Sequence, residues 1–313
     1  MKRATLGWIG DIMKPLVTII IPLYNKEQYI KECLDSIITQ SYTNFELLIL
    51  DDGSSDGSQQ VIREYLFDDR IKYSYKKNEG VSKTRNQGIV MAQGDFIVFL
   101  DADDSIHEKF LEKMVNEAMN FSSIVCCAHN KINMNTGKIR KSNSNFKTDI
   151  LISFLLNRLD INTNSWLISK KFLLENKILF DTDLRWGEDM LFFIKVLALS
   201  NSVKYLDEPL TNYNIEVSNS LSSFKKDKLN QDVIWVNRAI EFLKSNNFNE
   251  EYINALWNYR LPSLITYGLY SLKNEISLEE YKDLKQSYYK YYQNLKFNNG
   301  LRSIKTWLYK KKL

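Results

Sequence analysis

Two aspartates directly follow a short apolar segment of this 313-residue chain. Residues 96–100, Phe-Ile-Val-Phe-Leu, are typical of a strand buried on both faces, and Asp101 and Asp103 come next. Because side chains alternate along extended backbone, both carboxylates point to the same side if that geometry continues. They repel each other unless a cation lies between them, and Mg²⁺ or Mn²⁺ takes carboxylate ligands together with substrate phosphates. Without other signals, two aspartates at this spacing more often belong to a turn. Their place after a strand of an open α/β sheet, however, predicts a ligand site.

Three other segments support that prediction by placing polar residues after predicted strands. Residues 17–21 and 45–50 are apolar, and each run ends in turn formers and polar side chains. Residues 78–86 then lead through a helical stretch to the strand that ends at Asp101. Because strands and helices alternate with short connections, we expect an α/β fold with a mostly parallel sheet and helices on both faces.

Other elements follow from periodicity and capping signals. Asn25 and Gln28 predict a capping box ahead of a helix whose apolar face lies within residues 30–38. Further strands are expected at 71–75 and 123–128, and further helices at 58–67, 81–92, 107–120, 149–157 and 170–176. From about residue 222 the pattern is helical and rich in Tyr and Lys, which indicates a separate helical subdomain.

In this order and spacing, the segments resemble the inverting nucleotide-sugar glycosyltransferases of family 2, of the bacterial surface-glycan type, over about two thirds of the chain. The resemblance implies a GT-A (Rossmann-like) fold. It also implies transfer of a sugar from a nucleoside-diphosphate donor, with Mn²⁺ or Mg²⁺ as cofactor. The acceptor would be a hydroxyl of a glycan or of a lipid-linked or protein-linked molecule.

The resemblance also implies which residues form the donor site. It assigns Pro22 and Tyr24 to the wall of the base pocket, Asp52 to the nucleobase, Asn78 and Arg85 to the nucleotide, Asp101 to the ribose, and Ala102 and Asp103 to the donor, with Asp103 as the metal ligand. Asp104 is expected to support this turn or to cap the following helix.

The chemistry of Asp52 narrows the choice of donor. A carboxylate there can accept a hydrogen bond from the ring N–H of uracil, and thymine and guanine offer the same donor. Cytosine has none at that position, which disfavours a CMP-sugar. Thymine and guanine nucleotides stay open by this argument, and a UDP-sugar is the expected donor. The neighbouring Gly53, Asp56 and Gly57 are interpreted as a plain turn that leads to a helix cap.

Asp189, in Gly187-Glu188-Asp189-Met190, matches the catalytic-base motif of the family. Apolar residues at helical spacing follow it, so Asp189 is expected at a helix N-terminus, where the dipole keeps a carboxylate ionised. Such a carboxylate can take the proton of the acceptor hydroxyl as its oxygen attacks the anomeric carbon. Helix capping is the alternative interpretation. Trp186 is either a sugar-stacking or a core residue.

One position departs from the family pattern. Relatives often carry an aromatic-x-Arg run after this helix, and this chain has Tyr213-Asn214-Ile215. Asn214 holds the place of the arginine, so a phosphate contact from this loop is in doubt.

Composition bounds the class of protein. A 44% hydrophobic and 26% charged chain is typical of a globular protein, and a net charge of +4 is too small to indicate a nucleic-acid partner. We divide the chain into a disordered extension (1–14), a GT-A domain (15–221) and a helical subdomain (222–313). The three cysteines lack metal-ligand spacing, so buried thiols in a cytoplasmic protein are expected.

The C-terminal residues 282–313 combine lysines with tyrosines and Trp307. This composition suits peripheral contact with the inner face of a membrane, although a solvated helix face is the simpler interpretation. The helices are also a candidate surface for a homo-oligomer.

Two other functions were weighed. A dinucleotide-dependent oxidoreductase needs a glycine-rich turn after the first strand, and Pro22-Leu23-Tyr24-Asn25 stands there instead. A catalytically degenerate module that binds nucleotide or glycan remains the alternative. The joint presence of Asp52, Asp101, Asp103 and Asp189 argues against it.

Overall fold

A computed structural model describes residues 14–142, 149–215, 226–293, 295 and 308–313. The expected extension therefore lies outside the described residues except for Lys14, as does the proposed boundary after residue 221. The first elements are β1 (Val17–Leu23), α1 (Ile30–Ile38), β2 (Phe45–Asp51), α2 (Ser58–Arg63), β3 (Ile71–Tyr75), α3 (Val81–Met91), β4 (Phe96–Phe99), β5 (Ser105–Ile106) and α4 (Phe110–Asn120). Then follow β6 (Ile124–Asn133), β7 (Ile139–Lys141), α5 (Ile150–Leu155), η1 (Thr163–Ser165), β8 (Trp166–Ser169), α6 (Lys170–Glu175), α7 (Glu188–Leu199) and β9 (Lys204–Ile215). The C-terminal region contains α8 (Asp227–Ser245), α9 (Glu250–Ala255), the π-helical turn η2 (Leu256–Arg260), α10 (Leu261–Leu272), α11 (Leu278–Ser287) and α12 (Tyr289–Tyr292).

The strands of the described part form one sheet in the order β3-β2-β1-β4-β8-β6-β9-β5, with β7 paired to β6. From β3 to β4 all neighbours are parallel. Beyond β4 the sheet is mixed, since β8 runs antiparallel to β4 and β6, and β9 runs parallel to β6. The predicted α/β fold is confirmed, and its parallel half is the half that carries the predicted donor residues.

Strand β9 was not expected from the sequence. Its apolar pattern is interrupted by Asp207, Glu208 and Pro209, and its register with β6 shifts at this place, between Cys127 and His129. Such an irregularity hides the period-2 signal by which a strand is identified. The consequence is functional, because β9 carries Asn214 to the edge of the site.

The two faces of the parallel sheet are packed by alternate side chains of the same strands. In β1, Ile20 belongs to one buried cluster and Ile19 and Ile21 to the other, and all three are fully buried. Helices α3 and α7 contribute to the first cluster, and α1 and α4 to the second. Each such side chain adds roughly 1.5–3 kcal/mol of transfer free energy, which makes the sheet a rigid base for the loops at its edge.

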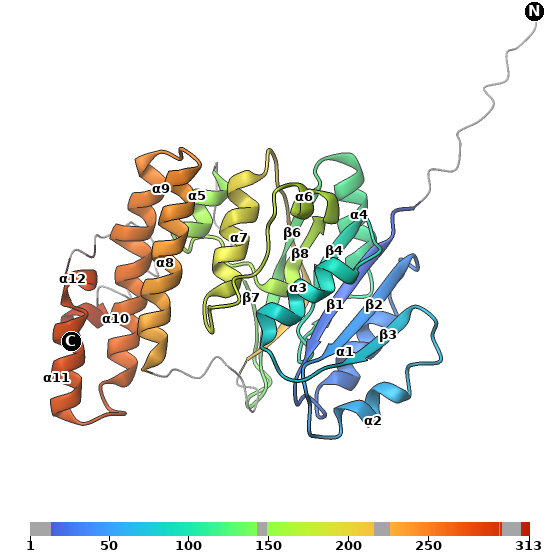
Figure 1. Cartoon of the computed structure of the whole chain (residues 1–313), viewed down its shortest axis with the longest axis horizontal. Coiled ribbons are helices and arrows are strands. Elements are labelled where there is room, and N and C mark those ends of the chain that lie inside the picture. The colour runs from blue at the N-terminus through green and yellow to red at the C-terminus, as the bar shows by residue number, and fades with distance from the viewer. Residues whose placement is uncertain (1–13, 143–148, 216–225, 294, 296–307) are drawn as a thin grey trace, which may run out of the picture.

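In the described residues, the C-terminal helices add to the first of these two buried clusters and do not form a separate hydrophobic core. Figure 1 shows α8 against α7, on the side away from the parallel strands. Phe99 of β4, Phe192 of α7 and Trp235 of α8 belong to the same buried cluster, and the first two rings meet edge to face at 5.7 Å. A continuous apolar core therefore joins the sheet to the helices that follow residue 226.

The predicted capping box at Asn25 is wrong. Helix α1 begins at Ile30, and its first turn has no side-chain cap. Asn25 instead adopts a left-handed backbone conformation (φ 51°), and its side-chain oxygen accepts a hydrogen bond from the Ser55 N–H at 2.8 Å. Residues 25–29 are thus a loop tied to the loop after β2, which leaves them at the carboxyl edge of the sheet.

Gly88 of α3 provides a test of the packing between this helix and the sheet. A Cβ at Gly88 would lie 2.5 Å from Cγ2 of Ile20, which is fully buried and cannot move aside. We expect Gly88→Ala to lower the free energy of unfolding by about 1–3 kcal/mol, as overpacked cores do. Urea unfolding measures the change. Val90→Ala, on the exposed side of the same helix, should stay within about 0.5 kcal/mol of the parent, and equal stability of all three proteins would refute the packing.

Candidate active site

The predicted acidic residues lie in the turn that follows β4. Asp101 faces Arg85 of α3, and the Oδ2 atom of Asp103 lies 2.6 Å from Nζ of Lys26, which comes from the loop after β1. Burial raises the pKa of Asp103, and the negative charge of Asp101 raises it further. The two carboxylates therefore share one site as predicted, and each is stabilised by a basic side chain.

Asp104 and Asn214 form the support beneath this turn. The Asp104 carboxyl is buried and accepts hydrogen bonds from Nδ2 of Asn164 and from the backbone N–H of Asn214, both at 2.9 Å. Nδ2 of Asn214 also donates to the carbonyl oxygen of Asp103 at 2.6 Å. Asp104 does not cap a helix, since α4 begins only at Phe110. Asn214 is buried and points toward the acidic turn, which is why it holds that turn instead of presenting a donor to a phosphate.

Arg85 connects the acidic turn to the start of α7. Its side chain is 5% exposed, and its two terminal nitrogens lie 2.7 Å from Oδ1 of Asp101 and 3.2 Å from Oε1 of Glu188. The guanidinium also lies over the ring of Phe180, 5.2 Å from its centroid. A planar, always charged guanidinium suits such a bridge, because it can donate to two carboxylates in fixed directions.

Glu188 and Asp189 begin helix α7, as predicted. The residue before them, Gly187, has φ +79°, a backbone conformation that residues other than glycine rarely adopt. Oδ1 of Asp189 accepts a hydrogen bond from the Met190 N–H at 2.7 Å. Burial raises the pKa of Glu188 to about 7, and repulsion from Asp189 adds to this effect. Burial raises the pKa of Asp189 as well, so one proton can be held by this pair near neutral pH.

Asp52 organises the loop between β3 and α3. Its two oxygens accept hydrogen bonds from the N–H groups of Glu79 and Gly80, at 2.9 and 2.8 Å, and from Nζ of Lys76. Burial alone would raise the pKa of Asp52, but these three donors outweigh it and lower the pKa. The carboxylate is thus ionised and fixed at the carboxyl end of β2, where the turn at Gly53 (φ +86°) also lies.

The remaining predicted donor residues lie around the same edge. Pro22 is paired in register with Leu50, and Tyr24 beyond it is half exposed. Asn78 is exposed in the loop held by Asp52, and Ala102 is buried between the two aspartates. The predicted residues therefore gather at the carboxyl ends of β1, β2 and β4, which is the ligand edge of such a sheet.

The donor set fits a hard divalent cation bound together with phosphates. Within the described residues no three His, Cys, Asp or Glu side chains are grouped as a complete metal cage. Asp103, however, offers carboxylate oxygens and pairs with a cationic group, the Lys26 ammonium, and its side chain is 18% exposed. Mg²⁺ in particular is often held by one or two carboxylates plus substrate phosphates.

The other singled-out residues have structural partners. The indole N–H of Trp186 donates to Asp232 of α8, and the Lys228 ammonium lies 3.5 Å from the centre of its ring. Trp186 is only partly buried and belongs to neither core cluster, so its role stays a prediction. His107 is exposed and accepts a hydrogen bond from the Lys109 N–H. The three cysteines are buried free thiols, as expected.

Several site residues were not identified from the sequence. Lys26 was given no role inside the predicted capping box of Asn25 and Gln28, and Glu188 was given no role beside Asp189. Their signal was position alone, since each lies within three residues of a predicted site residue. Lys76, which binds Asp52, lies in the loop after β3, and Asn164, which binds Asp104, lies in the short helix η1. Neither segment contains a motif, so only the fold brings the two residues to the site.

In the described part of the chain, no helix is long and apolar enough to cross a membrane. Much of the lysine- and tyrosine-rich tail, residues 294 and 296–307, lies outside the described residues. Membrane contact and oligomerisation through this region stay predictions.

Known proteins share this arrangement. Residues 18–197 match the family described as "Glycosyl transferase family 2". The putative glycosyltransferase EpsH of Bacillus subtilis (strain 168) is 30% identical over 252 residues, which are 77% of this chain and 73% of EpsH. The chain spans 38% and 64% of two other curated relatives.

Among solved structures, S. aureus TarS 1-349 in complex with UDP-GlcNAc has a TM-score of 0.67 at 22% identity, over 90% of this chain and 81% of TarS. The mannosyltransferase PcManGT from Pyrobaculum calidifontis, in complex with GDP-Man and Mn²⁺, has a TM-score of 0.59 at 16% identity, over 95% of this chain and 87% of PcManGT. These likenesses show the GT-A fold. The family match covers more than half of the residues of this chain, and the chain therefore belongs to glycosyltransferase family 2.

Proposed function

We propose that this glycosyltransferase is an inverting, metal-dependent enzyme that moves a sugar from a UDP-sugar to a hydroxyl group in cell-surface polysaccharide or glycoconjugate synthesis. The acceptor would be a glycan, a lipid-linked or a protein-linked molecule. The observation that carries the proposal is the Arg85 bridge, which holds the donor-side Asp101 and the base-side Glu188 next to each other.

The donor half of the proposal rests on the edge formed by β1, β2 and β4. The base would lie between Tyr24 and the loop that Asp52 holds, and the ribose would contact Asp101. Asp103 would hold Mn²⁺ or Mg²⁺, which supplies charge stabilisation to the departing diphosphate. The bound UDP-GlcNAc of TarS and the Mn²⁺ of PcManGT, on the same fold, support this choice of ligands.

The acceptor half rests on the start of α7. In one displacement, the acceptor oxygen forms a bond to the anomeric carbon while the bond from that carbon to the diphosphate oxygen breaks and its electron pair leaves with UDP. The acceptor proton passes to the carboxylate of Asp189. A single attack from the face opposite the leaving group inverts the anomeric configuration.

A degenerate binding module is the weaker alternative. Binding a nucleotide needs no pair of adjacent, partly buried carboxyl groups at the start of α7, and their repulsion and desolvation cost free energy. Raised pKa values of this kind, together with an arginine partner and a helix N-terminus, are typical of catalytic groups.

Metal dependence is tested at Asp103. We expect Asp103→Ala to abolish UDP release from a UDP-sugar panel and to weaken UDP binding only when Mn²⁺ is present, because the lost carboxylate acts through the cation. Asp207→Ala, which removes an exposed carboxylate far along the chain, is the control. Calorimetry with and without EDTA measures binding. Equal UDP release in EDTA and in Mn²⁺ would contradict metal dependence.

The base is tested by Asp189→Asn, which keeps the side-chain shape and a hydrogen-bond acceptor but cannot take a proton. Transfer should fall by roughly 10²–10⁴, while UDP affinity stays within a few-fold because other loops bind the nucleotide. Thermal unfolding checks that the variant folds. Unchanged transfer would mean that Asp189 only stabilises the helix start, and a product with retained configuration would refute the displacement.

The carboxyl pair predicts a pH profile. Because the pKa of Glu188 is raised to about 7, the pair holds a proton below that pH, and kcat/KM for UDP release should fall as pH drops through about 7. Glu188→Gln removes the neighbouring charge that favours protonation of Asp189. The fall of kcat/KM on the acid side of the pH profile should therefore move to lower pH. An unchanged pH of this fall would show that the pair does not set it, and loss of activity at every pH would make Glu188 the base.

A further inference from the structure

One face of helix α8 contacts the loop that leads into the start of α7. Its residues follow helical spacing, and each contacts the loop of residues 180–187 or its end: Lys228, Gln231, Asp232, Trp235 and Arg238. The other side of α8 is apolar and packs into the core.

Asp232 is the centre of these contacts. Its Oδ1 atom accepts hydrogen bonds from the indole N–H of Trp186, at 3.2 Å, and of Trp235, at 2.9 Å. The Lys228 ammonium covers the Trp186 ring at 3.5 Å from its centre, a cation–π contact that fixes the plane of the ring. Trp186 is therefore held by its edge and by its face, both from α8.

The same contacts reach the residue that starts α7. Gly187 lies so close to the Trp235 ring that an added Cβ would be 2.2 Å from its Cδ1 atom. Trp235 in turn is held by Asp232. Because Trp186 and Gly187 immediately precede Glu188 and Asp189, their position sets where these two carboxyl groups begin the helix.

The burial of Asp232 needs an explanation. The residue is 2% exposed, and burial raises its pKa to about 6 against the two indole donors that lower it. A buried carboxylate rarely adds net stability compared with a well-packed apolar residue. Its retention is understandable if its two hydrogen bonds fix a geometry that the protein uses.

We propose that Asp232 is a positioning residue for the catalytic base: through Trp186 and Trp235 it fixes the Trp186–Gly187 turn and so orients Asp189 toward the acceptor side of the site. The inference rests on the proposed function for the role of Asp189, but the positioning itself is a statement about geometry. It makes α8, which lies beyond the residues matched to the family, a working part of the active site.

Hydrogen exchange measures the positioning without reference to activity. In Asp232→Ala and in Trp186→Phe, which removes the indole N–H donor and shortens the ring, the backbone amides of a peptide covering residues 184–192 should exchange at least tenfold faster than in the parent. In Asp232→Asn the carbonyl oxygen can still accept both indole bonds, so exchange should remain near the parent rate.

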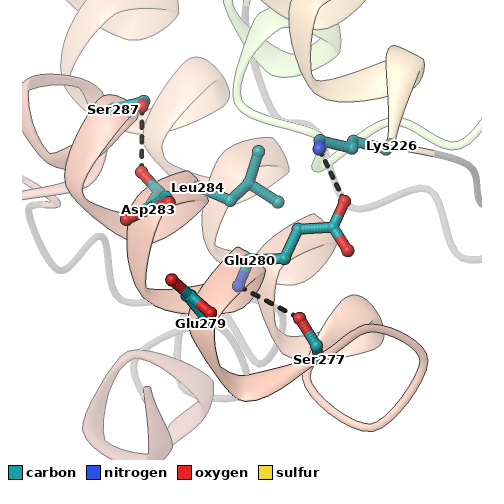
Figure 2. Close-up of a pocket in the computed structure, with 7 residues that line it drawn as sticks. All are labelled: Lys226, Ser277, Glu279, Glu280, Asp283, Leu284 and Ser287. Atoms are coloured by element: carbon teal, nitrogen blue, oxygen red, sulfur yellow. Dashed lines mark hydrogen bonds and ion pairs between the residues drawn. The ribbon is translucent and has the colours of Figure 1, made fainter.

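The matched control lies at the start of α8, on the side that faces α11. Figure 2 shows Lys226, just before the helix, paired with Glu280 of α11. The two charged groups are 2.7 Å apart, in a groove of about 430 Å³ whose lining contains none of the predicted site residues. Glu280→Gln removes the negative charge of this ion pair between helices and should leave both the exchange of residues 184–192 and UDP release at parent values.

Kinetics then link the positioning to the reaction. Asp232→Ala and Trp186→Phe should lower kcat for UDP release about 10–100-fold and leave UDP affinity within twofold, since misplacing a reacting group by about 1 Å costs up to this much. Asp232→Asn should restore kcat to within about threefold. If Asp232→Ala fails to fold, Trp186→Phe carries the test alone.

The outcomes distinguish the positioning role of Asp232 from the proposed function of the enzyme. Parent-like exchange and kcat in folded Trp186→Phe and Asp232→Ala would overturn the positioning role, as would an equal loss in Glu280→Gln. Faster exchange in the two variants, in a protein whose parent form releases no UDP from any donor, would support the positioning and refute the proposed function instead.

Discussion

The buried guanidinium of Arg85 is the contact on which the two halves of the site depend. It lies on α3, between the turn after β4 and the start of α7, and it donates to one carboxylate of each. Without it, Asp101 and Glu188 would be two negative charges facing each other in a poorly hydrated space. The approach of α7 to the sheet edge therefore requires a cation at this place, and the ring of Phe180 beneath it fixes where that cation lies.

The position of α7 is determined from its other side by the C-terminal helices. The core that joins β4 to α7 continues without interruption into α8, so the helix that carries Glu188 and Asp189 is packed between two rigid layers. Arg85 acts on the first residue of α7 from the sheet, and the Asp232 contacts act on the preceding turn from α8. A side chain at a helix start is otherwise exposed to fraying, and here both sides of that start are held.

The parallel half of the fold and the acidic residues could be predicted because each has a local signal. Runs of buried apolar residues mark β1, β2 and β4, and the polar residues after them fall at the ligand edge by the rule for parallel strands. The start of α7 was predicted from Gly187 and the apolar period that follows. Asp52 was predicted to face a nucleobase, and the structure adds a role the sequence could not give, because its partners Glu79 and Gly80 lie 27 and 28 residues away.

What could not be predicted depends on contacts between distant segments. Asn214 seemed a lost phosphate ligand, because a family pattern compares residue types without their surroundings. In the fold it lies on the irregular strand β9 and supports Asp103 and Asp104 across more than one hundred residues of sequence. The prediction of Asn25 as a helix cap was wrong for a related reason. It used only the neighbouring residues, whereas in the fold the Asn25 side chain binds Ser55 in the loop after β2.

The charges of the site explain why a donor would bind there with a cation rather than alone. Asp101, Asp103, Glu188 and Asp189 bring four carboxyl groups to one edge, and Arg85 and Lys26 are the basic side chains paired with them. A nucleoside diphosphate adds further negative charge next to Asp101 and Asp103, which would raise the energy of the complex unless positive charge arrives as well. A divalent ion on Asp103 would supply it and would release the Lys26 ammonium, which could then pair with a diphosphate oxygen. In the proposed reaction, the Lys26 ammonium would therefore pass from the Asp103 carboxylate to the diphosphate as donor and metal bind together.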